Sequence, residues 1–133
     1  MLNRYTSLVL AAVIYTAVAM LGSGCAFEDG HPPQPRIGLA PDSVLENDGF
    51  QTLISLDATG SSDPIDDPNA VRPLKFRWHI SNDEFRFESG DETSTNPTLK
   101  FRGDRPATIE LTATDEDGFS GTTSVQLRLV VFR

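Results

Sequence analysis

The sequence predicts an all-β domain, built as two packed layers of about seven short antiparallel strands. Apolar and polar residues alternate with a period of two in several stretches of the chain after residue 37. Within this region, no window shows the 3.6-residue periodicity of an amphipathic helix of useful length. Turn-forming residues separate the alternating stretches at short intervals. Such alternation places one face of each strand on a hydrophobic core and the other face in water.

The N-terminal segment has the features of an export signal rather than of a folded domain. An apolar run, Leu8–Leu21, follows a single positive side chain at Arg4. A membrane-spanning helix needs about 20 apolar residues, whereas the apolar part of a signal peptide needs roughly 7–15. The run ends in the small residues Gly22–Gly24, directly before Cys25. This pattern resembles the signal of bacterial lipoproteins, which are cut before a cysteine that then receives lipid.

The resemblance implies that residues 1–24 are removed and that a lipid on Cys25 attaches the protein to a membrane. Several acyl chains give stable anchoring, whereas one gives only marginal binding. The family usually has Leu, Val or Ala at the position of Gly22, so an ordinary secretory signal is the alternative. In the commonest sorting scheme an Asp after the cysteine retains a lipoprotein in the inner membrane. Ala26 therefore favours the outer membrane of a bacterial envelope, on its periplasmic or surface face.

Residues 25–36 are predicted to form a spacer between the lipid and the domain, which spans residues 37–133. Three prolines fall within Pro32–Pro35, and proline cannot donate the backbone hydrogen bond that helices and sheets require. Proline-rich segments adopt extended, semi-rigid geometry. We expect His31 in this spacer to be solvated, and a metal-binding role is the alternative.

The strands follow one another along the domain. Val44–Glu46 and Gln51–Leu56 flank Asn47–Gly49, whose residue types tolerate the positive φ angles of a hairpin turn. The longer alternating runs are Leu74–Ile80, Ile109–Ala113 and Val125–Val131, and the shorter predicted strands are Phe85–Phe87 at an edge and Leu99–Phe101. This number of short strands over about 100 residues is typical of an immunoglobulin-like β-sandwich.

The inward positions of these strands predict the centre of the core. These positions hold Phe76, Trp78, Leu111 and Leu127. Trp78 is the only tryptophan of the chain, and a large aromatic ring commonly fills the centre of such sandwiches. The alternative for Trp78 is a surface platform on which a carbohydrate stacks.

Four segments, in this order and spacing within residues 51–131, carry a family resemblance. They read ISLDATGSSDP at 54–64, LKFRW at 74–78, TNPTL at 95–99 and IELTATDEDGFS at 109–120. Together they resemble the polycystic kidney disease (PKD) domain, an immunoglobulin-like module. Two positions depart from the family: the W-D-F-G-D-G turn reads WHISND from Trp78, and Ala107 replaces a usual Tyr. The resemblance implies a non-catalytic role in adhesion, in carbohydrate or protein binding, or as a spacer.

Two acidic loops form the candidate binding site. An immunoglobulin-like sandwich brings the loop after the second predicted strand and the loop between the last two strands to the same end. These loops carry Asp63, Asp66, Asp67, Asp115 and Asp117, with Glu116 beside them. Ca²⁺ takes six to eight oxygen ligands, and some PKD-like domains bind it. No cofactor is certain, and the alternative is that these carboxylates cap turns and stay solvated.

Charge and residue content narrow the function. The chain carries 11 Lys and Arg against 19 Asp and Glu, a net charge of −8. This excludes nucleic acid as the expected partner, because phosphates attract cationic proteins. Neither histidine is placed beside a serine nucleophile, since His31 lies in the spacer and His79 faces outward from a strand. We therefore expect no enzyme.

Two functions remain for an envelope-anchored domain. The first is a module that binds an unknown protein or glycan, as in adhesion. The alternative is a structural accessory subunit that docks onto a larger envelope assembly. An exposed apolar patch over an edge strand would favour docking, whereas exposed aromatic residues beside a calcium site would favour adhesion.

Overall fold

Eight β-strands and no helix make up the part of the chain that the computed structural model describes, residues 30–131. The strands are β1 (Gly38–Ala40), β2 (Ser43–Leu45), β3 (Leu53–Asp57), β4 (Lys75–Ile80), β5 (Phe85–Ser89), β6 (Thr98–Phe101), β7 (Ala107–Thr114) and β8 (Ser120–Val130). The predicted signal peptide and Cys25 lie outside the described residues. Within residues 30–131, no helix has the length and apolar character needed to cross a membrane.

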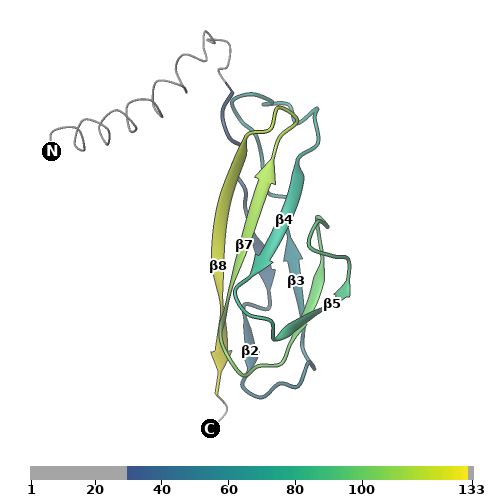
Figure 1. The fold of residues 1–133 in the computed structure, drawn as a ribbon, viewed down its shortest axis with the longest axis vertical. Helices are drawn as coiled ribbons and strands as arrows, with labels where there is room; N and C mark the ends of the chain where they lie inside the picture. The colour runs from purple at the N-terminus through teal and green to yellow at the C-terminus, as the bar shows by residue number, and fades with distance from the viewer. Residues whose placement is uncertain (1–29, 132–133) are drawn as a thin grey trace, which may run out of the picture. The chain divides into compact units, whose positions relative to one another are not determined.

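The strands form two four-stranded sheets, which confirms the predicted all-β sandwich. The first sheet has the order β1-β3-β6-β5, and the second has the order β2-β8-β7-β4. Figure 1 shows β8, β7 and β4 running side by side. All pairs are antiparallel except β2 with β8, which is parallel. Seven of these strands correspond to predicted ones, and the additional strand is β1, which the sequence did not predict.

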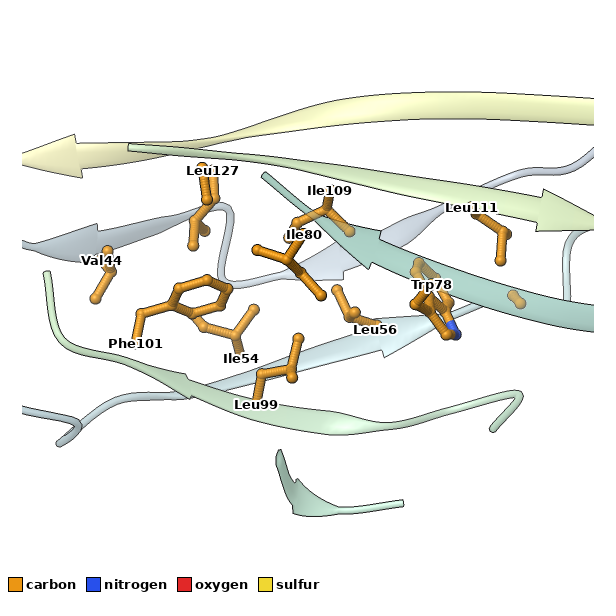
Figure 2. Close-up of a cluster of buried hydrophobic side chains, with 12 residues drawn as sticks. Val44, Ile54, Leu56, Trp78, Ile80, Leu99, Phe101, Ile109, Leu111 and Leu127 are labelled. Atoms are coloured by element: carbon orange, nitrogen blue, oxygen red, sulfur yellow. The ribbon is translucent and has the colours of Figure 1, made fainter. Parts of the chain in front are cut away.

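The core lies between the sheets, where the inward side chains of both layers meet (Figure 2). Strand β7 shows most clearly how alternation along a strand builds this core, because every second residue from Ala107 to Ala113 is buried. Of the predicted core residues, Trp78, Leu111 and Leu127 are buried, and Phe76 packs partly buried against them. The indole Nε1–H of Trp78 donates to the Ser94 carbonyl at 2.8 Å. The only polar group of the ring is therefore satisfied inside the protein.

The predicted hairpin at Asn47–Gly49 is wrong. Strands β2 and β3, on either side of it, belong to different sheets. The N–H groups of Asn47 and Gly49 instead donate to backbone carbonyls that follow β6, at 2.8 Å each. Both residues do have positive φ angles, 58° and 61°. Asn47 and Gly49 therefore adopt the expected backbone conformation, but the segment crosses between the layers because its hydrogen-bond partners come from another loop.

The domain begins at His31, earlier than the predicted boundary at residue 37. Gln34 exchanges two backbone hydrogen bonds with Ser62, at 2.6 and 3.0 Å, and Pro33 is buried. A Cβ atom at Gly121 of β8 would overlap the Pro33 carbonyl oxygen. The residues of the predicted spacer from His31 onward therefore lie against the folded domain, where Gln34 forms a β-bridge with Ser62.

Candidate acidic metal site

Three of the five predicted acidic ligands meet at one end of the sandwich. We call this the acidic end: the loop between β3 and β4 together with the turn between β7 and β8, which lie at the same end in Figure 1. One carboxylate oxygen each from Asp63, Asp66 and Asp115 lies within 4.8 Å of the others. The fold brings these groups together because both loops leave neighbouring ends of the two layers.

Asp63 and Asp115 are almost completely buried, with exposed fractions of 5 and 6%. The Asp115 Oδ1 accepts the N–H groups of Asp117 and Phe119 at 2.9 Å each, which shapes the turn before β8. The Oδ2 atoms of Asp63 and Asp115 are buried and have no hydrogen-bond partner. A buried polar atom without a partner costs roughly 1–3 kcal/mol, and more when it is charged. These two oxygens are therefore candidate ligands for a cation.

Asp66 holds the start of the domain onto the acidic end. Its carboxylate accepts the backbone N–H of His31, and its Oδ1 lies 3.2 Å from the His31 ring Nδ1. The His31 backbone hydrogen bond is the main reason that the pKa of Asp66 lies below its ordinary value. A carboxyl with a pKa lowered by folding stabilises the fold above pH ~4. It loses that contribution as the pH falls through the lowered pKa.

Asp67 and Asp117, the other two predicted ligands, are engaged elsewhere. The Asp67 carboxylate accepts the N–H groups of Val71 and Arg72, at 3.0 and 2.7 Å. The Arg72 backbone bond is the main cause of the lowered pKa of Asp67. The Arg72 guanidinium donates to the Asp117 carboxylate at 3.2 Å and ties the two loops together. These two residues therefore have the turn-capping and solvated roles that the sequence left open as the alternative.

The donor set consists of oxygen atoms only, which suits a hard cation. Ca²⁺ binds carboxylate oxygens at 2.3–2.6 Å, so oxygens on opposite sides of one ion stand about 5 Å apart. The spacing of up to 4.8 Å between the three carboxylates fits such an ion. His31, expected to be solvated, is the residue near this site that the sequence missed. No local signal joins it to Asp66, 35 residues away.

A second surface feature lies where β2 pairs with the end of β8. Leu45 and Val130 are cross-strand partners, and their side chains are 43 and 40% exposed. Val131 follows directly and is also exposed. Strand β2 is the edge of its sheet. We call these three residues the apolar edge.

The comparison with solved structures decides the fold type. The solution structure of the PKD domain from the KIAA 1837 protein matches with a TM-score of 0.53 at 20% identity, over 78% of this chain and 92% of that chain. The domain has a PKD-like immunoglobulin fold. No protein-family model and no curated protein matches the sequence.

Two further structures resemble the PKD-like domain. One is a nucleoside hydrolase-related hypothetical protein from Saccharophagus degradans that is associated with carbohydrate metabolism (TM-score 0.49, 19% identity, 76% of this chain). The other is a structure of carbohydrate-binding modules from the β-sandwich superfamily (TM-score 0.48, 19% identity, 77% of this chain). The chain spans 26% of the first and 36% of the second. At these identities the similarity concerns the fold alone.

Proposed function

We propose that this chain is an envelope lipoprotein, held on a membrane by lipid at Cys25, whose PKD-like domain docks onto another envelope protein. The domain itself is non-catalytic, and a Ca²⁺ ion held by Asp63, Asp66 and Asp115 stabilises it. The observation that carries the docking role is the apolar edge on β2 and β8.

The apolar edge has the character of a protein contact. Exposed edge strands usually carry charges or prolines that prevent pairing with another chain. Here a three-residue edge strand presents Leu45 beside Val130 instead. Clustered apolar side chains at a sheet edge fit a protein surface or an added strand. The apolar edge therefore favours docking onto a protein. Adhesion to a glycan is less favoured, because the one tryptophan is buried and offers no stacking platform.

The apolar edge also lies far from the point where the chain enters the domain. Gly121, near the start of β8, lies beside Pro33, whereas Val130 is at the other end of the same strand. At roughly 3.3 Å per residue, these two ends are about 30 Å apart. A domain tethered at its acidic end would therefore present the apolar edge away from the membrane.

Site-specific photocrosslinking tests this docking role. We expect a crosslinking residue at position 45, introduced into the full-length protein in its native cells, to give one discrete adduct with an envelope protein. The control position is Ser124, an exposed residue in the middle of β8, the strand that pairs with β2. We expect no adduct there, because Ser124 lies outside the apolar edge.

A charge substitution separates docking from folding. Val130→Asp should abolish the adduct formed from position 45. Because Val130 is exposed, the substitution should change the free energy of unfolding of the domain by only about 0.5 kcal/mol. Equal adducts from positions 45 and 124, or an adduct that survives Val130→Asp, would contradict the docking surface. They would leave the lipid anchor unaffected.

A further inference from the structure

The acidic end also carries the most exposed large apolar side chains of the described domain. Ile65 is 61% exposed and Val71 is 78% exposed. Both lie in the loop between β3 and β4 that supplies Asp63 and Asp66. Both side chains are therefore free to contact an apolar surface at this end of the domain.

The same loop holds the chain that leads back to Cys25. His31 hydrogen-bonds to Asp66, and Gln34 pairs with Ser62. Fully extended, the backbone between Cys25 and His31 spans on the order of 20 Å. This inference rests on the proposed function, because it requires lipid on Cys25. A lipid there keeps the acidic end within that distance of the bilayer.

We propose that the acidic end of the domain seats on the membrane surface, with Ile65 and Val71 in the headgroup region of the lipids. Apolar side chains on a peripheral surface gain from burial at the boundary between headgroups and acyl chains. The short chain to Cys25 favours this contact by keeping the local concentration of the membrane surface high. The partner of this surface is thus the bilayer that already holds the anchor.

Charge makes the seating dependent on calcium. Asp63, Asp66 and Asp115 would repel anionic headgroups if their charges stayed uncompensated. The nearest cationic side chain, Arg72, is already paired with Asp117. A Ca²⁺ ion among the three carboxylates would offset two of their three negative charges and would hold the loop that carries Ile65 through Asp63 and Asp66. Seating therefore requires the same ion that stabilises the fold.

Fluorescence quenching on vesicles tests the seating. The acylated protein is placed on vesicles of phosphatidylethanolamine and phosphatidylglycerol, with an environment-sensitive dye on a cysteine introduced as Ile65→Cys. Lipid occupies Cys25, so the introduced thiol is labelled selectively. Leu53→Cys is the matched control, because Leu53 is half exposed and lies at the opposite end of β3 from the acidic end.

With calcium, we expect the dye at position 65 to be quenched by spin-labelled lipid and to be several-fold less accessible to aqueous iodide than the dye at position 53. Chelator should remove the difference. A Val71→Cys variant should behave like Ile65→Cys, which guards against a local effect of one substitution.

Three results would overturn the seating. Equal iodide quenching at positions 65 and 53, in protein that still floats with the vesicles, would refute it and leave the lipid anchor standing. Protection from iodide without quenching by the lipid spin label would show that this surface is covered by a second copy of the chain instead of by lipid. Protein that lacks acyl groups by mass spectrometry and leaves the vesicles would overturn both the seating and the anchor.

Discussion

Replacing Trp78 with alanine is expected to lower the free energy of unfolding by about 3–5 kcal/mol. The ring is buried between the two sheets, and its Nε1–H donates to the Ser94 carbonyl at 2.8 Å. Small domains have a total stability of only about 5–15 kcal/mol. The melting temperature should therefore fall by roughly 12 °C or more. Thermal and urea unfolding of the purified protein measure this change.

Two control variants separate the parts of this effect. Trp78→Phe keeps an aromatic ring and loses the hydrogen bond, so it should cost less than Trp78→Ala. His79→Ala changes an exposed neighbour on the same strand and should stay within about 0.5 kcal/mol. An unchanged melting temperature for Trp78→Ala would place the ring on the surface, as a carbohydrate platform requires.

Calcium is expected to stabilise the domain by about 2.7 kcal/mol when its free concentration is 100 times the dissociation constant. An ion that binds only the folded state raises stability by mass action. For a domain of this size the melting temperature should rise by roughly 10 °C. Magnesium should do less, because it requires tighter octahedral geometry and keeps its waters. Thermal melts in chelator, in calcium and in sodium chloride of matched ionic strength measure the difference.

Variants of the acidic end assign the calcium effect to residues. Asp63→Asn and Asp115→Asn each neutralise a buried carboxylate with an unpartnered oxygen, so both should remove the calcium-dependent rise. Asp67→Asn should keep the rise, because this carboxylate caps the backbone at Val71 and Arg72 instead. Identical melts in calcium and in matched sodium would eliminate the metal site.

The sequence predicted the sandwich because period-two alternation depends only on which face of a strand is buried. Phe85–Phe87 shows this well, since the predicted edge strand is part of β5 at the edge of the first sheet. Strand β1 escaped prediction because Gly38–Ala40 is too short and too poor in apolar residues to alternate visibly. The hairpin failed because turn residues determine local φ angles and leave the sheet that each flanking strand joins undetermined.

The candidate site was predictable at the level of loops and not at the level of ligands. Topology alone brings Asp63 and Asp115 to one end of the sandwich. Whether an aspartate faces a shared centre or caps its own turn depends on hydrogen bonds within the loop, as Asp67 shows. The contact of His31 with Asp66 depends on how the N-terminal segment lies along the folded domain. A contact of this kind leaves no pattern in the sequence.

Cell fractionation of a Cys25→Ala variant tests the lipid anchor, on which the proposed function rests, most directly. The wild-type protein should sediment with envelope membranes, and its N-terminal peptide should carry acyl chains. The variant should appear in the soluble fraction with an unchanged melting temperature, because the folded domain begins at His31. Ser23→Ala, which leaves the cysteine intact, should behave as wild type. Cys25→Ala protein that remains with the membranes at the wild-type level would contradict the lipid anchor.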